Sequence, residues 1–506
     1  MKNIVLTNET AQVILNKVDA FKNDRNKLQL QIGVKSLGDG LACQTILVNG
    51  GMMSEIGFKT SGIPEDYIEG SSSYFTVNVS ACTFISYLKA LIPFDANIQL
   101  WYDEKSTLYM QVGNAARVSV STFEEMDALL PCDHRSACAM VKLETKKFLN
   151  ALKVGSFVAT PAPDSRGITD RVVIKFTPEQ TVIYSTDTFI MTKAWCESKA
   201  QFNKPNRCVA YLNEKLGRLG QTDKAALIAK IEKVMTDPKA TVQLAEEEGF
   251  EDGPITISLP ASSMAVFKTI CSGTENLTVV ITPDHVVVNA GNVFATFSLA
   301  GRASEVFEKS VDPWELTSWT GLAVVDKEGL INSLAIAALS ASPASSKKNV
   351  APFHTSFLKD KMIVTDRLNN KVALPLIKSA GDLSKVNIHL DVEKALNVLG
   401  KLANGNVVLR YFIAPDGSCK FPVSISNGDI EADGTFSYTY ILPVNIKKEE
   451  KKEETNTTSE TFGSSNEKSE SQGAAANEPP QPAPEATSPS EDDIPALDDP
   501  GFDDVM

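Results

Sequence analysis

The segment FTVNVSACTFISYLKALI, residues 75–92, contains two hydrophobic periods in succession. Apolar residues alternate with polar ones as far as Val79, and they recur at helical spacing from residue 81 onward. Ser80 stands where the period changes, and serine is a favoured helix N-cap. The segment is therefore predicted to be a strand that runs directly into an amphipathic helix.

The same pattern recurs along the first 446 residues. Two further copies are ITISLPASSMAVFKTIC (255–271) and VNIHLDVEKALNVLGKLA (386–403). Pro260 and Asp391 stand at the change of period in these copies, and Asp391, like Ser80, suits a helix N-cap. A second set consists of NIVLTNETAQVILNKVDAF (3–21), MVKLETKKFLNALKVGSFVA (140–159) and GLAVVDKEGLINSLAIAALS (321–340). Strand-like runs separated by turn residues follow each copy, which predicts six units of the form βαβββ.

The two sets interleave, so the units pair into three domains of an α+β fold. The predicted domains are residues 1–138, 139–314 and 315–446. The middle domain is longer than the others, and the excess lies near residues 199–250. Within it, residues 222–236 have helical spacing and good helix-forming residues, which predicts a helical insertion.

Residues 447–506 differ in composition from the rest and are predicted to be a disordered acidic tail. The chain has a net charge of −14; the tail holds 16 acidic residues and five lysines, which leaves −3 for residues 1–446. Few large apolar residues remain in the tail to offset the entropy of ordering. The tip alone carries spaced apolar residues, which fit either a short linear motif or chance: Ile494, Leu497, Phe502, Val505 and Met506.

The composition indicates a globular protein of a reducing, cytoplasmic compartment. The sequence contains no run of 18 apolar residues, so no membrane span is predicted. The first residues lack the apolar stretch of a signal peptide. The eight cysteines include no Cys-x-x-Cys pair, which argues against a disulfide scaffold. Residues 1–446, with a net charge of only −3, are not expected to bind nucleic acid through bulk charge.

With these repeats the chain resembles the bacterial DNA polymerase III beta subunit, the sliding clamp, over almost all of residues 1–446. The segments that carry the resemblance, by their order and spacing, are GNAARVSVSTFEEMDALLP (113–131), SRGITDRVVIKF (165–176), VIYSTDTFIMTKA (182–194) and YTYILPVNI (438–446). Thr188 stands where the family usually has Gly, and Ile190 where it has Arg. Residues 441–444 replace the family's Met-Pro-Met. These departures, with the insertion and tail, indicate a divergent member.

The resemblance implies a protein without enzymatic activity, cofactor or metal. Clamps of this family are head-to-tail dimers of three-domain subunits, and they close a ring around duplex DNA without sequence specificity. The expected partners are therefore duplex DNA, a second copy of the chain, and a DNA polymerase and clamp loader that bind through short peptides. A near-neutral body suits such a topological link, because weak phosphate contacts permit sliding.

The resemblance also places a partner-peptide cleft between the middle and last domains. Its predicted residues are Ile168, Thr186, Thr188, Phe189, Met191, Tyr440, Leu442, Pro443 and Val444. Apolar anchors of a short peptide would fill such a cleft. The alternative is that residues such as Met191 are ordinary strand-core residues.

Basic residues on the helices of the ring would face DNA. The candidates are Arg25 and Lys27 in the loop after the first helix, and then Lys146, Lys147, Lys153, Arg166, Lys268, Lys394 and Lys401. Solvated lysines are common on helix faces, so each one alone is a weak signal. At the subunit interface the resemblance places Val118, Val120 and Leu339, which could equally be core residues.

Catalytic and metal-binding sites have little support in the sequence. Cys132, His134 and Cys138 are close together, but no second pair of ligands has zinc spacing. Residues 185–187 (Ser-Thr-Asp) could be combined with His389 as an acid–base pair, but nothing else in the sequence supports a catalytic site there. The alternative to a clamp is a non-ring, DNA-associated scaffold whose acidic tail recruits replication or repair proteins.

Overall fold

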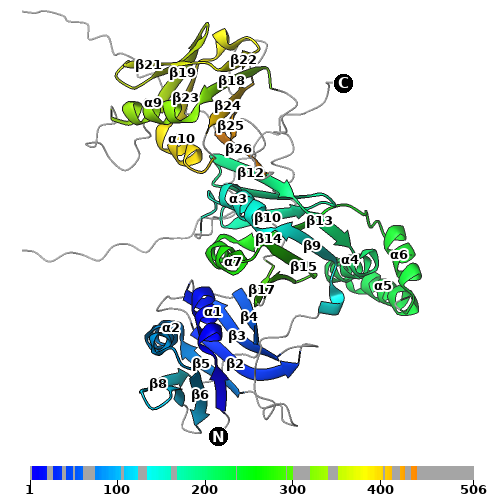
Figure 1. Ribbon diagram of the computed structural model, residues 1–506. Helices are drawn as coiled ribbons and strands as arrows, with labels where there is room; N and C mark the ends of the chain where they lie inside the picture. Colours follow the sequence, from blue (N-terminus) through cyan, green and yellow to red (C-terminus); the bar gives the residue numbers. More distant parts are fainter. Residues whose placement is uncertain are drawn as a thin grey trace, which may run out of the picture. The chain divides into compact units, whose positions relative to one another are not determined.

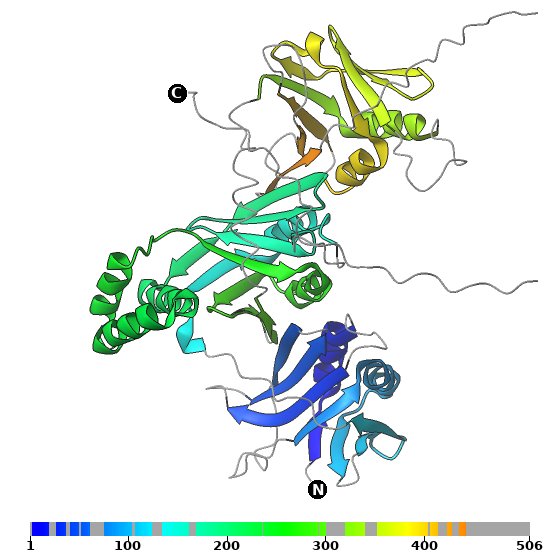
Figure 2. The same cartoon turned by 180° about the vertical axis from the view of Figure 1, so that it is seen from behind.

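The computed structural model describes most of the first 441 residues (Figure 1 and Figure 2). The described ranges are 3–19, 27–36, 41–49, 52–60, 75–103, 107–123, 134–160, 168–234, 236–291, 293–299, 319–339, 352–402, 405–412, 422–427 and 435–441. The predicted tail lies outside them, as do Arg25, Cys132, Arg166, Leu442, Pro443 and Val444.

The first 123 residues form two units in the predicted order. The first unit comprises β1 (Asn3–Leu6), α1 (Asn8–Val18), β2 (Lys27–Ser36), β3 (Leu41–Asn49) and β4 (Met52–Thr60). The second comprises β5 (Phe75–Ser80), α2 (Ala81–Leu91), β6 (Ile98–Asp103), β7 (Thr107–Val112) and β8 (Ala116–Phe123).

The middle part repeats the order twice, on either side of an insertion. Its first unit is β9 (Ala139–Glu144), α3 (Thr145–Gly155), β10 (Arg171–Phe176), β11 (Gln180–Thr186) and β12 (Ile190–Glu197). Its second is β14 (Ile255–Pro260), α7 (Met264–Cys271), β15 (Asn276–Ile281), β16 (His285–Ala290) and β17 (Val293–Ser298).

The last part completes the six units. It contains β18 (Gly321–Asp326), α9 (Lys327–Leu339), β19 (Pro352–Leu358), β20 (Lys361–Thr365), β21 (Lys371–Pro375) and the short β22 (Lys378–Ala380). It ends with β23 (Ile388–Asp391), α10 (Val392–Leu399), β24 (Asn406–Tyr411), β25 (Val423–Asn427) and β26 (Thr435–Ile441).

The helices begin where the hydrophobic period changes. The Ser80 side chain accepts a hydrogen bond from the backbone N–H of Thr83 at the start of α2. Asp391 does the same for Lys394 at the start of α10, over 3.1 Å. Both predicted N-caps are confirmed, and they satisfy backbone donors that the first helical turn leaves without partners.

Strand pairing continues from one predicted domain to the next. In a 13-stranded sheet, β4 pairs antiparallel with β17, with Phe58 opposite Val293. In a 9-stranded sheet, β12 pairs antiparallel with β26, with Ile190 opposite Ile441. A third sheet has the order β21-β20-β19-β23. Backbone hydrogen bonds therefore link the first part to the middle one, and the middle one to the last.

The helices pack in pairs, one pair for each two units. The contacts join α1 with α2, α3 with α7, and α9 with α10. In the middle pair, the rings of Phe148 and Phe267 lie 5.9 Å apart, and Phe267 lies 4.9 Å from Phe297 on β17. These fully buried rings anchor both helices to the sheets behind them.

The insertion is a small three-helix body with its own core. Residues 199–202, predicted as its beginning, instead form strand β13 (Lys199–Phe202), which pairs with β9 at a sheet edge. The helices are α4 (Lys204–Arg218), α5 (Gln221–Val234) and α6 (Pro238–Glu247). Their buried apolar cluster consists of Cys208, Leu212, Leu227, Leu244 and Ala245.

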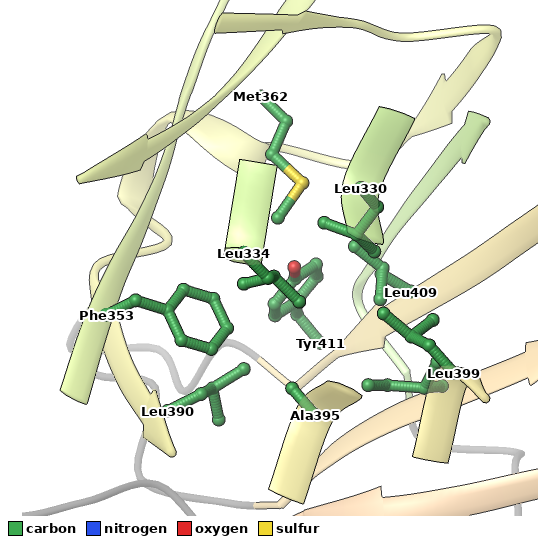
Figure 3. Close-up of a pocket in the computed structure, with 10 residues that line it drawn as sticks. Leu330, Leu334, Phe353, Met362, Leu390, Ala395, Leu399, Leu409 and Tyr411 are labelled. Carbon is green, nitrogen blue, oxygen red and sulfur yellow. The ribbon is translucent and has the colours of Figure 1, made fainter. Parts of the chain in front are cut away.

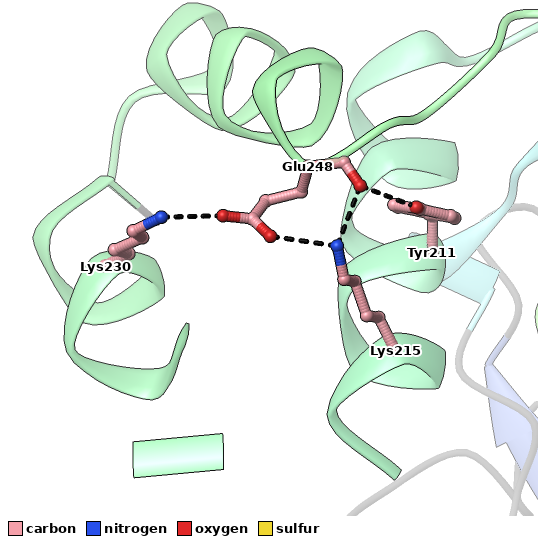
Figure 4. Close-up of polar contacts among 4 residues, drawn as sticks. All are labelled: Tyr211, Lys215, Lys230 and Glu248. Carbon is pink, nitrogen blue, oxygen red and sulfur yellow. Dashed lines mark hydrogen bonds and ion pairs between the residues drawn. The ribbon is translucent and has the colours of Figure 1, made fainter. Parts of the chain in front are cut away.

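Charge also holds these helices together, through Glu248 at the end of α6. Its carboxylate lies 2.9 Å from Lys215 Nζ on α4 and 2.7 Å from Lys230 Nζ on α5 (Figure 4). Its backbone carbonyl accepts hydrogen bonds from the Tyr211 hydroxyl and from Lys215 Nζ, each over 2.8 Å. One residue thus links all three helices.

The insertion is fastened to the segment that precedes β9. Asn206 Nδ2 donates to the carbonyl oxygens of Arg135 and Ala137, over 3.0 and 2.8 Å. The backbone N–H of Asn203 donates to the carbonyl oxygen of Cys138 over 2.8 Å. The inserted helices therefore hold the segment that links the first and middle parts.

The last part encloses a cavity of only about 10 Å³ between α9, α10 and the sheets (Figure 3). Its walls include Leu334, Phe353, Met362 and Leu399, and the Tyr411 hydroxyl supplies an oxygen. A space of this size holds at most about one water molecule. It is a packing gap, much smaller than a ligand pocket.

Candidate partner-binding face and DNA-facing helices

Strands β10, β11 and β12 of the 9-stranded sheet, which we call the middle sheet, have two unlike faces. Alternate residues of β10, among them Val172 and Ile174, are fully buried on the side that α3 covers. The side chains of the opposite side form a separate cluster, which we call the outer face. It consists of Ile168, Val173, Val182, Tyr184, Met191 and Trp195.

The outer face continues onto the last part of the chain through β26. Met191 lies opposite Tyr440 in the strand register, and Trp195 lies opposite Phe436. The rings of Trp195 and Phe436 are 6.0 Å apart. Residues about 240 positions apart in the sequence therefore share one apolar surface.

The turn between β11 and β12 lies at one end of this face. The Asp187 carboxylate accepts hydrogen bonds from the backbone N–H groups of Phe189 and Ile190, over 2.9 and 2.6 Å. Thr188 has φ = 76°, a left-handed conformation that glycine adopts at little cost. The turn leaves the Phe189 side chain 57% exposed.

Two lysines lie against aromatic rings at the outer face and its end. Lys394 Nζ, on α10, is 3.7 Å from the centre of the Phe189 ring. Lys193 Nζ is 5.5 Å from the centre of the Tyr184 ring, and the residue is only 8% exposed. Both are cation–π contacts, which hold positive charge beside an apolar surface.

The structure brings several of the predicted cleft residues together. Ile168 and Met191 pack on one cluster, while Thr186, Thr188 and Phe189 belong to the adjoining turn. Tyr440 takes its place through the backbone pairing of β26. Sequence reasoning missed Val182, Tyr184 and Trp195, because apolar residues follow one another at 182–184 and 189–191 and leave no alternation that marks the outer face.

The predicted DNA-facing lysines of α3 differ in their surroundings. Lys146 and Lys153 are exposed. Lys147 lies 3.2 Å from both Glu144 and Glu197, and its hydrogen bonds to Glu197 and then Glu144 raise its pKa. Lys27, expected in the loop after the first helix, is instead the first residue of β2.

Lys268 on α7 and Lys401, just after α10, come close to each other. Burial lowers the pKa of Lys268, and the charge of Lys401 lowers it further. Lys401 Nζ lies 6.0 Å from the centre of the Phe157 ring. A nearby phosphate would relieve the repulsion between the two ammonium groups. Lys394, by contrast, lies against Phe189 and belongs to the end of the outer face.

Lys17, which sequence reasoning missed, links α1 to α7. Its Nζ donates to the carbonyl oxygens of Thr269, Ile270 and Ser272, over 2.9, 3.1 and 2.6 Å. These carbonyls lie at the C-terminal end of α7, where intrahelical partners run out. The ammonium group therefore fastens the first part of the chain to the middle part.

The predicted interface residues lie on a strand edge and at a helix end. In β8, residues 116–121 pair with β7, whereas the pairing with β5 involves only Thr122 and Phe123. Val118 is half-buried and Val120 is 1% exposed, so the Val120 side chain packs in the core of its own domain. Leu339 is 85% exposed at the end of α9.

The described residues show neither a metal cluster nor a membrane-spanning helix. No group of three or more His, Cys, Asp or Glu side chains among them could hold a metal ion. No described helix is long and apolar enough to cross a bilayer. In residues 185–187, the Asp187 carboxylate stabilises the turn, and Ser185 Oγ lies 2.8 Å from Thr192 Oγ1.

Comparison with solved structures gives consistent neighbours. The DNA polymerase sliding clamps of Bacillus subtilis and Pseudomonas aeruginosa superpose with TM-scores of 0.60 and 0.59. Each is 13% identical and covers 88% of this chain and 99% of its own. A Helicobacter pylori beta clamp bound to a DNA ligase peptide has a TM-score of 0.56 at 13% identity, over 88% and 100% of the two chains. No protein-family model and no curated protein sequence matches the chain.

Proposed function

We propose that this chain, which has the fold of the bacterial DNA polymerase sliding clamps, is itself a sliding clamp that encircles duplex DNA. The observation that carries the proposal is the repeat architecture: six βαβββ units, with helices paired two by two and sheets that continue through β4–β17 and β12–β26. Such a protein acts by topology and performs no catalysis. It would work on DNA in the cytoplasm.

Two strand edges support closure of the ring by a second copy of the chain. Among the described strands, residues 116–121 of β8 pair with β7 on one side, and β21 pairs with β20 on one side. A head-to-tail dimer would join these edges and extend the sheet across the joint. Leu339 and Ile336, which are 85% and 49% exposed on α9, would supply apolar area beside that joint.

The paired helices would line the channel for DNA. Lys146, Lys153, Lys268 and Lys401 contribute positive charge at separate positions on or beside these helices. Scattered charges of this kind make weak phosphate contacts, which hold DNA in the channel without arresting the ring.

The outer face would receive short peptides from partner proteins such as a polymerase or clamp loader. It offers Met191 and Trp195 as partly buried apolar contacts, with Phe189 exposed at its end. The Helicobacter pylori clamp bound to a DNA ligase peptide supports peptide binding as a property of this fold.

The function is tested on linear duplexes onto which the protein first threads in low salt, and whose ends are then either left open or blocked by streptavidin. A clamp slides off open ends, so it should remain only on blocked duplexes after a wash in high salt. A scaffold that binds phosphates directly would dissociate from both in high salt, because its contacts are screened. Equal retention on the two duplexes would refute the proposal.

The dimer is tested by native mass measurement of the whole chain. The wild type should give twice the mass of one chain. Leu339→Asp places a charge in the proposed joint and should shift the equilibrium toward monomer, whereas Phe94→Asp, an exposed residue outside it, should not. A monomeric wild type at tens of micromolar would contradict ring closure.

A further inference from the structure

The outer face carries positive charge among its apolar residues. In the strand register Lys175 lies opposite Val182, and Lys193 lies opposite Tyr184. Lys394 adds a third ammonium group beside Phe189. The apolar residues packed on Val173, Val182 and Tyr184 are Ile168, Met191 and Trp195. In the described part of the chain, the cluster is therefore formed by residues of β10, β11 and β12 together with Ile168, which precedes β10.

The C-terminal segment has complementary chemistry. Residues 447–506 combine 16 acidic residues with five lysines, and the lysines lie mainly at the beginning. The last sixteen residues, EDDIPALDDPGFDDVM (491–506), place Ile494, Leu497 and Phe502 between pairs of carboxylates. We call these sixteen residues the tip. Apolar anchors flanked by acids suit an apolar face flanked by lysines.

The chain leaves the described structure beside this same face. The last residue of β26, Ile441, pairs with Ile190, which directly follows the turn that bears Phe189. Some 55 residues separate Ile441 from Leu497. Polymer statistics give a chain of that length an end-to-end distance of roughly 40 Å, so the linker is long enough for the tip to reach the outer face of its own subunit. Tethering at this range gives an effective concentration of about a millimolar.

We propose that the tip docks on the outer face of its own subunit and competes there with partner peptides. The inference rests on the proposed function, because it takes the outer face to be a peptide-binding surface. Leu497 and Phe502 provide the apolar contacts to Met191 and Trp195. The flanking carboxylates pair with Lys175 and Lys394. A partner must displace the tip, and salt weakens the tip's hold because these charges are screened.

The test measures how tightly the full chain binds a fluorescent peptide of residues 491–506, added in trans. Three proteins are compared: the wild type, the double variant Leu497→Asp/Phe502→Asp, and Phe462→Asp as a matched control in the same tail. The double variant frees the face and should bind the probe about 10-fold more tightly than the other two, given the effective concentration of the tether. Equal affinity for all three, or no binding to any, overturns the proposal.

A substitution on the face checks where the probe binds. Lys175→Glu, added to the double variant, should weaken probe binding at least about threefold, because it replaces attraction with repulsion. Unchanged affinity would mean that the probe binds elsewhere, which also overturns the proposal. Competition in the wild type should not depend on protein concentration. Competition that grows with concentration would place the tip on a neighbouring molecule and refute docking within one subunit.

The retention assay on blocked duplexes separates this inference from the proposed function. Neither tail substitution touches the ring, so both variants should remain on blocked DNA as the wild type does. Retention with equal probe affinities would refute the docking of the tip alone. Loss of retention by the wild type would refute the clamp itself.

Discussion

The two faces of the middle sheet are built from alternate residues of the same strands, yet they differ in what covers them. On the inner face, Ile174 and Ile183 are fully buried in a core to which α3 contributes Phe148. On the outer face, Met191 and Trp195 are partly buried, and lysines lie against the neighbouring aromatic rings. The period of two thus gives one face of the sheet to the core and leaves the other for the proposed peptide binding. Substitutions on the two faces should therefore have separable effects.

The largest effect is expected on the inner face. Phe148→Ala removes a fully buried ring that contacts Phe267, and it should lower the free energy of unfolding by about 3–5 kcal/mol. Phe189→Ala, the matched change at the exposed end of the outer face, should cost no more than about 1 kcal/mol, the scale of its contact with Lys394. Urea unfolding measures both. Equal losses would abolish the distinction between the faces.

The outer face should instead respond in binding. Met191→Ala should weaken a short peptide with Leu and Phe anchors by about 1–3 kcal/mol, because an apolar contact is lost where the peptide excludes water. Calorimetry on the full chain measures this change. Met140→Ala, on the exposed side of β9, serves as the control and should leave affinity unchanged. If both variants bind like the wild type, partner peptides bind elsewhere.

A smaller effect is expected from the turn that ends the outer face. Thr188 has φ = 76°, so Thr188→Gly should raise the free energy of unfolding by about 1 kcal/mol through relief of backbone strain. Thr188→Ala keeps the Cβ atom and should gain little. Thermal unfolding of the two variants checks this, and a destabilised glycine variant would show that the Thr188 side chain makes contacts that outweigh its strain.

The smallest effect on stability is expected in the insertion, which lies on neither face of the middle sheet and is held together partly by ion pairs of Glu248. Hydrogen bonds from Lys230 and then Lys215 lower the pKa of Glu248 below 4.5. Because the folded pKa is the lower one, this contribution to stability is complete above pH 4.5 and is lost as pH falls below it.

Glu248→Gln should therefore cost about 0.5–1 kcal/mol at neutral pH and less near pH 3. Circular dichroism melts at the two pH values measure the difference. A cost that does not change with pH would mean that the carboxylate's charge contributes nothing.

The sequence predicted the elements well because their signals are local. The change of period at Ser80 and Asp391 gave both helix starts, since an N-cap acts within three residues of itself. The alternation around Val118 and Val120 predicted a strand but not which side faces the core. That choice depends on which face the helices cover, and it places the Val120 side chain inside.

Contacts between distant elements were beyond the sequence. Lys17 ends an ordinary amphipathic helix, and only the approach of α7 makes it a cap for that helix's carbonyls. Lys394 was assigned to DNA by its place on a helix, yet it lies against Phe189, some 200 residues earlier. Neither pair leaves a mark on local periodicity or composition, because each arises from the packing of separate units.

Trapping on a closed circle tests most directly whether the protein encircles DNA. Rings are allowed to thread onto linear duplex in low salt, and the duplex is then circularised with ligase. After a high-salt wash, the protein that remains on the circles is counted before and after a single restriction cut. We predict that protein stays on intact circles, leaves once they are cut, and is not trapped in the Leu339→Asp variant. Protein that washes off intact circles, or stays bound after the cut, would contradict the account.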